Sequence, residues 1–262
     1  MIAKESGCSV IQHDDGSDPG MHDLEILGLD DTAAVEVVAD INKRRHELWT
    51  IIDDQPWLTE PDSGSWFVTL EEQARVKKLR DELPAVIALL NRQGRERLDV
   101  PGWPIEDAGV LPAPEVQLLR NARRLGIKKL SRYEQPAGEP GKIWLTPPPS
   151  GGFVDREGTA VSSWIVEFLS DDRRADVRQK LHRSGADQRH AFVIVPSSTT
   201  APNEVVLYLM SEDRVPPLSS PLLPPEITHV WIVDTFTHFE PTGIRWSPGV
   251  GWKTFAKVFD DQ

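Results

Sequence analysis

Two carboxylates in consecutive apolar segments are the residues of this sequence with the clearest potential for chemistry. Asp23 lies in the segment 22–26, and Glu36 interrupts the otherwise apolar segment 33–38. A buried carboxylate is costly unless it is paired, hydrogen-bonded or bound to a metal. Two of them on neighbouring strands can share a hard cation such as Mg²⁺ or Mn²⁺, with a backbone carbonyl, here that of Val37, and water as further ligands. Such a cation activates water and stabilises charge on a phosphate.

A β-hairpin is predicted to bring these two carboxylates together. Residues 22–26 alternate polar and apolar side chains, which is the period of a half-buried strand. Residues 33–38 are apolar and partly β-branched, and the intervening Gly28 and Asp30 favour a turn. We expect Asp40 to cap a helix over residues 41–52 that follows the hairpin.

The remaining periodicities predict an α/β protein with a mixed central sheet flanked by helices, because strands alternate with helices and few strands are strictly amphipathic. Further strands are expected at residues 65–70, 142–146, 190–195 and 229–233, with a terminal hairpin around residues 243–255. Helices are expected at residues 71–92, with a kink or break at Pro84, and at 114–125, 164–169, 172–181 and 202–210. We predict one elaborated domain over residues 1–262, with an irregular acidic arm at 1–20 and a helical insertion at 71–125.

The order strand, Asp, turn, strand, Glu-x-x resembles the core of the PD-(D/E)XK nuclease superfamily, which has the restriction-endonuclease-like fold. In that family an aspartate on one strand and a Glu-x-Lys on the next bind the metal, and the lysine positions the attacking water. The resemblance implies that Asp23 and Glu36 are the metal ligands. Val38 stands where the family has its lysine, so the cation must come from elsewhere in the chain: Lys43 or Arg44, Lys142, or Lys180.

The function expected from this resemblance is metal-dependent hydrolysis of phosphodiester bonds in nucleic acid. Asp23, Glu36 and Lys43 are the predicted catalytic residues, and Mg or Mn is the predicted cofactor. Val38 favours an alternative, a non-catalytic interaction protein built on a degenerate version of the fold. Such a protein would contact a protein partner through a surface patch, for which Trp246 and Trp252 are candidates. The favoured interpretation of these two tryptophans is core packing in the terminal hairpin.

A third alternative is a small-molecule enzyme whose site lies between the Gly151-Gly152 loop and the strand at 190–195. Both His13 and His22 lie near the acidic stretch and are candidates for a metal ligand or a general base. The plainer interpretation of these two histidines is ordinary hydrogen bonding in a loop or at a strand edge. The sequence leaves the oligomeric state open, a dimer included.

The charge distribution limits the classes of partner. The 262 residues carry 29 Lys and Arg against 41 Asp and Glu, for a net charge of −12. Residues 1–40 alone hold ten acids and one base. This balance argues against a protein that coats nucleic acid non-specifically, but it allows a local basic groove. Basic clusters that would form such a groove if they shared one side of the fold lie at residues 43–45, 77–80, 120–124, 128–129 and 173–174.

Composition also bears on the compartment. No apolar run reaches the roughly 18–20 residues of a membrane helix, so no membrane association is expected. The first residues have no apolar segment of the kind found in secretory signals, and a cytoplasmic location is expected. Cys8 is the single cysteine, which excludes an intramolecular disulfide and any zinc site built from several cysteines.

Overall fold

The chain divides into two compact units, which are described separately. The computed structural model describes residues 2–17, 20–28, 32–53, 57–58, 64–102, 105, 111–134, 141–146, 157–235 and 243–255. Unit 1 comprises Met1–Ile41 and Gly151–Gln262, and unit 2 comprises Asn42–Ser150. The prediction of one domain with a helical insertion at 71–125 therefore needs correction. The inserted segment is longer, and it has a sheet and a core of its own.

Unit 1 is built on a seven-stranded mixed sheet of order β1-β2-β3-β9-β10-β11-β12. The strands are β1 (Ser9–Gln12), β2 (Leu24–Leu27), β3 (Ala33–Ala39), β9 (Gln188–Val195), β10 (His229–Asp234), β11 (Gly243–Ser247) and β12 (Gly251–Phe255). The central pairs β3–β9 and β9–β10 are parallel, and the outer pairs are antiparallel. This arrangement confirms the predicted hairpin of β2 and β3 and the predicted terminal hairpin of β11 and β12.

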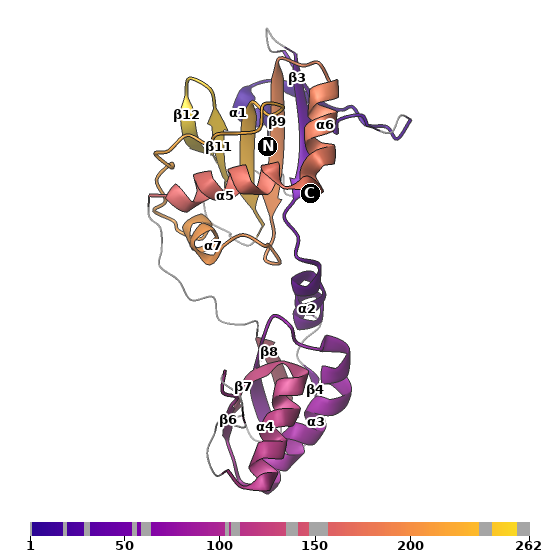
Figure 1. Cartoon of the computed structure of the whole chain (residues 1–262), viewed down its shortest axis with the longest axis vertical. Helices are drawn as coiled ribbons and strands as arrows, with labels where there is room; N and C mark the ends of the chain where they lie inside the picture. Colours follow the sequence, from indigo (N-terminus) through magenta and orange to yellow (C-terminus); the bar gives the residue numbers. More distant parts are fainter. Residues whose placement is uncertain are drawn as a thin grey trace. The chain divides into compact units, whose positions relative to one another are not determined.

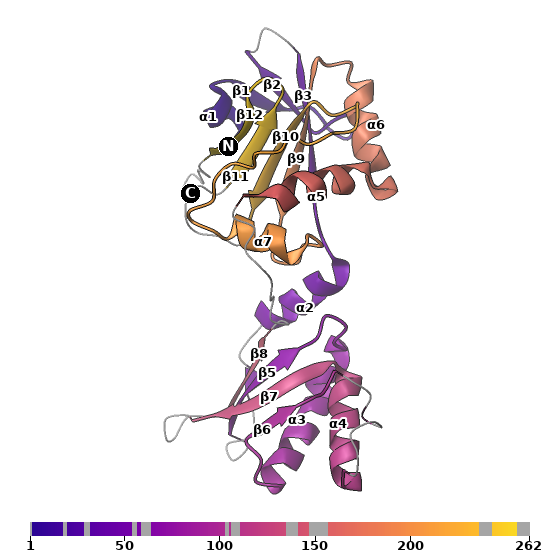
Figure 2. The ribbon, with the colours of Figure 1, turned by 60° about the vertical axis from the view of Figure 1, so that its left-hand side comes forward.

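Helices cover both faces of this sheet (Figures 1 and 2). The helical segments of unit 1 are α1 (Ile2–Ser6), α5 (Thr159–Ser170), η3 (Asp172–Arg174), α6 (Ala175–Arg183) and α7 (Asn203–Leu209). The three longer helices bury one face of the sheet, including Ala34 and Val38 of β3. On the opposite face, Ile2 of α1 packs in a smaller cluster that includes Val35. Because side chains alternate along a strand, Glu36 lies on the face covered by α5, α6 and α7.

The first twenty residues are not the irregular arm that their glycines suggested. They contain α1 and β1, and β1 pairs antiparallel with β2 as the edge strand of the sheet. Ile2 is buried, which ties this segment to the core of unit 1. Local composition missed the strand because its four residues are mostly exposed and carry no alternating burial.

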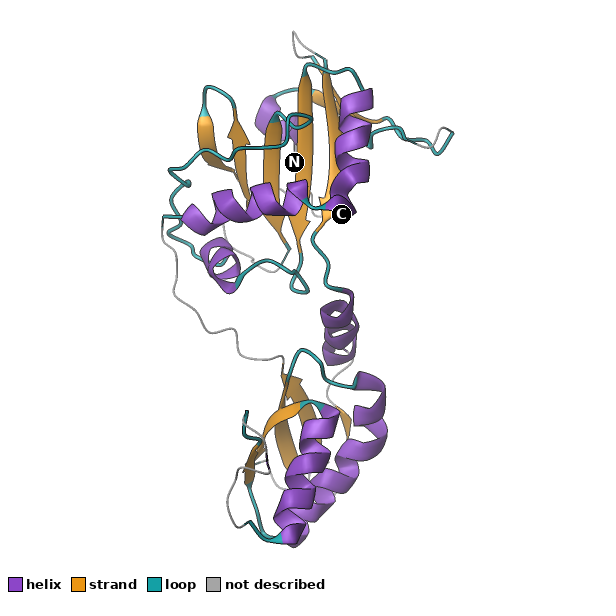
Figure 3. Cartoon of the chain, viewed as in Figure 1, coloured by secondary structure: helices purple, strands orange, loops and turns teal. Residues whose placement is uncertain are grey.

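Unit 2 has a five-stranded sheet of order β4-β8-β5-β7-β6, with one edge strand, β4, of only two residues. The strands are β4 (Trp57–Leu58), β5 (Ser65–Leu70), β6 (Arg97–Asp99), β7 (Ile127–Tyr133) and β8 (Lys142–Thr146), and the helices are α2 (Lys43–Asp53), α3 (Val76–Arg92) and α4 (Ala113–Leu125). Figure 3 shows α3 and α4 side by side against this sheet. Leu83 of α3 and Leu118 of α4 belong to a core drawn entirely from unit 2.

The predicted break of the helix at Pro84 and the predicted helix cap at Asp40 were wrong. The helix α3 continues through Pro84, whose side chain is exposed, while Leu79, Leu83 and Ile87 on the same helix are buried. Burial of that apolar stripe outweighs the hydrogen bond that the proline removes. Asp40 does not cap α2, since its carboxylate is buried and accepts hydrogen bonds from Thr199 and Thr200.

The cap of α2 is Asn42. The side-chain oxygen of Asn42 accepts hydrogen bonds from the backbone amide of Arg44, at 3.0 Å, and from that of Arg45, at 3.1 Å.

Among the helices that the structure describes, none combines the length and apolar character needed to cross a bilayer.

Candidate active site

The hairpin of β2 and β3 places Asp23 opposite Glu36, as predicted. Leu24 pairs with Val35 in the antiparallel register. Asp23, which directly precedes β2, therefore faces Glu36 of β3. The Val37 amide donates a hydrogen bond of 2.7 Å to Oδ2 of Asp23, which fixes the aspartate side chain against β3. Asp23 is half-buried and Glu36 is 4% exposed.

A lysine from α6 completes this group. The Nζ of Lys180 lies 2.9 Å from Oε1 of Glu36 and 3.9 Å from Oδ1 of Asp23. Val177 and Leu181 of the same helix are buried in the core beneath it. Residues three apart share a helix face, so the side chain of Lys180 is held toward β3. We call Asp23, Glu36 and Lys180 the acid–lysine cluster.

Burial dominates the electrostatics of the cluster. It raises the pKa of Glu36 to about 7, against the lowering effect of the hydrogen bond from Lys180, and the charge of Asp23 raises that pKa further. The hydrogen bond to Glu36 raises the pKa of Lys180. Lys180 therefore remains an ammonium ion at neutral pH, suited to holding an anion rather than to abstracting a proton.

The oxygen atoms of the cluster fit a hard divalent cation. Oε2 of Glu36 is buried and accepts no hydrogen bond from any residue in the described part of the chain. In an extended strand the N–H and C=O of one residue point to the same side, so the bond from the Val37 amide to Asp23 also directs the Val37 carbonyl toward that side. Two carboxylates and a carbonyl form the ligand set that Mg²⁺ and Mn²⁺ prefer.

Lys180 makes the contact that was predicted first for Lys43. Lys43 begins α2, and Arg44 follows it, so both belong to unit 2, as does Lys142 of β8. Lys180 was one of the alternatives named for the missing cation. A sharper signal was present in the sequence, because Val177 and Leu181 mark the apolar face of a helix and Lys180 lies beside them on that face.

A second group with metal-binding potential adjoins the cluster. The rings of His13 and His22 stack with centroids 4.0 Å apart, and Nδ1 of His13 lies 3.8 Å from Oε2 of Glu25. One ligand atom from each of the three residues lies within 4.8 Å of the others. Burial lowers the pKa of His22, and its Nε2 has no partner among the described residues, so the ring is a neutral, available ligand.

The other sites considered from the sequence are the two tryptophans of the terminal hairpin and the Gly151-Gly152 loop. Trp252 is buried, and its indole N–H donates to Ser162 and Ser219, which confirms core packing for this residue and removes it from an interaction patch. Trp246, which pairs with it across the terminal hairpin, is half-buried. The Gly151-Gly152 loop lies outside the described residues.

The acid–lysine cluster can hold a cation through its carboxylates and an anionic oxygen through its ammonium group. Such a pair of functions suits the transfer of a charged phosphoryl group to water. Comparison of this chain with protein-family models, with curated proteins and with solved structures finds no match.

Proposed function

We propose that this protein is a divergent metal-dependent nuclease that hydrolyses phosphodiester bonds in nucleic acid. The observation that carries the proposal is the convergence of Asp23, which precedes β2, with Glu36 of β3 and Lys180 of α6 at one point of the unit 1 sheet. Two acids and a lysine are the residue types that the resemblance to the PD-(D/E)XK superfamily requires. Here the lysine comes from α6 instead of the position of Val38.

The order of the elements also supports the proposal. The antiparallel hairpin of β2 and β3 is followed, after a crossover through α5 and α6, by the parallel strands β9 and β10. Helices cover both faces of the sheet, as the restriction-endonuclease-like core implied by the resemblance would have. The lysine-bearing helix α6 is part of that crossover, which explains how a cation distant in sequence reaches β3.

Each residue of the cluster has a distinct role in the proposed reaction. Oδ1 of Asp23, Oε2 of Glu36 and the Val37 carbonyl would hold Mg²⁺ or Mn²⁺, which when bound supplies an activated water and neutralises phosphate charge. The ammonium group of Lys180 orients the water or the non-bridging phosphate oxygen by donating hydrogen bonds. The amide of Val37 keeps Asp23 in place while this happens.

The non-catalytic alternative has one specific observation in its favour. Lys180 and Glu36 already form a hydrogen-bonded ion pair, so the buried glutamate is compensated without a cation. Such a pair can serve the folded state alone. In that case the cluster is a remnant, and the protein acts through a partner instead.

Cleavage assays test the proposal directly. Plasmid, linear DNA and RNA are incubated with Mg²⁺ or Mn²⁺ and with wild type, Asp23→Asn, Glu36→Gln or the control Glu212→Gln, an exposed loop residue. We expect each cluster variant to lose at least about 100-fold in rate, since even the outer partners of metal ligands matter by 10–100-fold. Cleavage that survives both cluster substitutions contradicts the proposal. The absence of cleavage on every substrate favours the non-catalytic alternative.

A binding measurement assigns the metal to one of the two neighbouring groups. Calorimetric titration of Mn²⁺ is expected to lose its signal in Asp23→Asn and Glu36→Gln. It should persist in the double variant His13→Gln/His22→Gln, because imidazole is a poorer ligand for this hard cation than carboxylate is. If the Mn²⁺ signal is lost in the double histidine variant and persists in Asp23→Asn and Glu36→Gln, the metal site is instead formed by His13, His22 and Glu25.

A further inference from the structure

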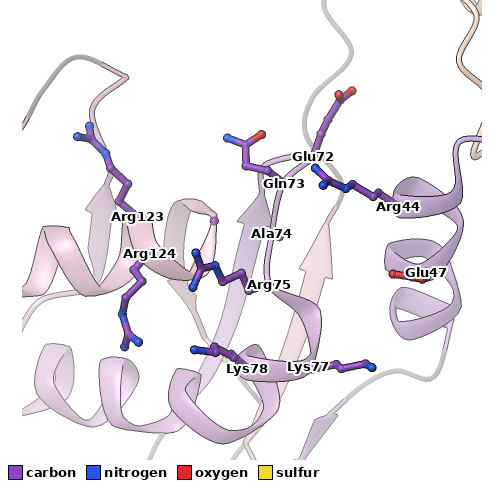
Figure 4. A pocket seen from close by; sticks show the side chains of 11 residues that line it. Arg44, Glu47, Glu72, Gln73, Ala74, Arg75, Lys77, Lys78, Arg123 and Arg124 are labelled. Carbon is purple, nitrogen blue, oxygen red and sulfur yellow. The ribbon is translucent and has the colours of Figure 1, made fainter.

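Unit 2 contains a hollow of about 680 Å³ lined mainly by cations (Figure 4). It lies among α2, the residues before α3 and the end of α4. Six of its lining residues are basic: Arg44, Arg75, Lys77, Lys78, Arg123 and Arg124. Its two acids are Glu47 and Glu72, and Glu72 is paired with Arg45. We call this feature the basic hollow.

A close backbone approach holds two of the basic segments side by side. The amide of Glu71 donates to the Gly126 carbonyl at 2.8 Å, and the amide of Arg75 donates to the Leu125 carbonyl at 3.0 Å. Gly126 has a φ of +76°, and a Cβ added there would lie 2.4 Å from the Cα of Ala74. Only glycine permits this contact, which brings the start of α3 next to the end of α4.

The helix that borders the hollow has charges of the wrong sign for its own dipole. The N-terminal end of α3, a helix of 17 residues, carries Arg75, Lys77 and Lys78, with no acid in its first turn and no side-chain cap. Cations at a helix N-terminus repel the positive end of the dipole, whereas an anion there is attracted. By contrast, Glu115 lies in the first turn of α4, which is the favourable arrangement.

Most of these cations also lack a fixed counter-ion. Arg124 pairs with Glu82, and Arg123 donates to the Pro101 carbonyl. Within the described ranges, no ion pair engages Arg44, Arg75, Lys77 or Lys78, and all four side chains are exposed. Exposed cations gathered around one concave surface create a positive potential that an anionic ligand would complete.

The charge of the whole chain is divided in a way that favours this surface for a polyanion. Residues 42–150 carry 17 Lys and Arg against 16 Asp and Glu, so the net charge of −12 arises in unit 1. We propose that the basic hollow binds the sugar–phosphate backbone of nucleic acid and supplies the substrate-binding surface of the nuclease. Several cations around one hollow match a chain of phosphates. The substrate class rests on the proposed function.

Fluorescence anisotropy with labelled nucleic acid tests this inference without any need for catalysis. Fluorescein-labelled duplex DNA and single-stranded RNA are titrated with the full chain in EDTA at salt concentrations between about 50 and 200 mM. We expect wild type to bind one or both with an affinity that falls as salt rises. The variant Lys77→Gln/Lys78→Gln is expected to bind roughly tenfold more weakly at the lowest salt, with a shallower salt slope by about two.

A charge-matched control separates a local site from net charge. Arg92→Gln/Lys128→Gln removes two exposed cations of unit 2 that do not line the hollow, and it should bind as wild type does. The melting temperature of Lys77→Gln/Lys78→Gln should not fall, since the change removes cations from a helix N-terminus. Equal loss in both variants, or no binding by wild type at about 50 mM salt, overturns the inference.

The two proposals fail in distinguishable ways. If nucleic acid binds through the basic hollow but no cleavage occurs with Mg²⁺ or Mn²⁺, the proposed hydrolysis is wrong and the binding surface stands. If cleavage occurs and Lys77→Gln/Lys78→Gln keeps the wild-type KM, the hollow is not the binding surface, and the catalytic proposal stands.

Discussion

At the scale of single residues, the proposed chemistry depends most on Lys180. It is the cation that contacts both carboxylates, and it is only 24% exposed in its side chain. Its hydrogen bond to Glu36 raises its pKa, so its contribution is a fixed positive charge. A fixed charge in a partly dry site acts on the transition state more than on the bound substrate.

Replacement of Lys180 by methionine is therefore expected to lower kcat by on the order of 10²–10³-fold, with a much smaller change in KM. Lys180→Arg keeps the charge and should recover part of the rate. Steady-state kinetics on the best substrate measure both constants. Lys253→Met, an exposed residue of β12, provides the matched control. An unchanged kcat in Lys180→Met would remove the lysine from the mechanism.

At the scale of elements, the parallel strands β9 and β10 carry a buried pair of histidines that shapes the response to acid. His190 and His229 are adjacent in register, and their rings stack with centroids 4.2 Å apart. Nδ1 of His190 accepts the indole N–H of Trp231 at 3.0 Å. Burial lowers the pKa of His190 to about 3 and that of His229 to about 4, from an ordinary value of 6.5.

These lowered pKa values predict a loss of stability in mild acid. Below pH 6.5 the unfolded chain binds protons at both histidines and the folded chain does not, so their contribution to the free energy of unfolding decreases as the pH falls toward 4. The raised pKa of Glu36 acts in the opposite direction over the same range and offsets part of this loss. Each histidine should contribute a loss of roughly 2 kcal/mol between pH 7 and pH 5. Urea unfolding followed by tryptophan fluorescence at both pH values measures the change.

In the variant His229→Gln, the free energy of unfolding is expected to decrease less between pH 7 and pH 5 than it does in wild type. His46→Gln, an exposed residue of α2, should leave the pH dependence as it is. Wild type and His229→Gln having the same dependence on pH would show that another group controls it.

At the scale of the whole molecule, the chain contains two separately built cores. Among the residues that the structure describes, the two core clusters of unit 1 draw none from unit 2, and the core of unit 2 draws none from unit 1. The proposed catalytic cluster belongs to the first unit and the basic hollow to the second. Each function can therefore be altered by substitutions whose effects on packing stay within one unit.

Two unfolding transitions are expected in calorimetry. Leu83→Ala removes a fully buried side chain of unit 2, and Ile232→Ala removes one of unit 1. Each should destabilise its own unit by about 2–5 kcal/mol and shift only one transition. A single transition that both variants shift together would show that the two units unfold as one.

The sequence by itself determined the hairpin and its two acids. Alternation at residues 22–26 and the apolar run at 33–38 are local signals, and strands joined by a short turn usually pair. The helices α3 and α4 and the strands β5, β8, β9 and β10 followed from periodicity for the same reason. Those signals depend on neighbours within a few residues, which the chain carries with it.

Only the tertiary structure decided what lies far apart in the sequence. Lys180 and Glu36 are 144 residues apart, and no local pattern specifies that α6 packs on β3. The strands β6, of three residues, and β7, of seven, belong to a second sheet that composition did not indicate, and this sheet makes the insertion a unit of its own. Arg75 lines the same hollow as Arg123 and Arg124 because the backbone of Ala74 lies close to Gly126. Such contacts form because distant apolar surfaces are buried together, and that free energy belongs to the whole fold.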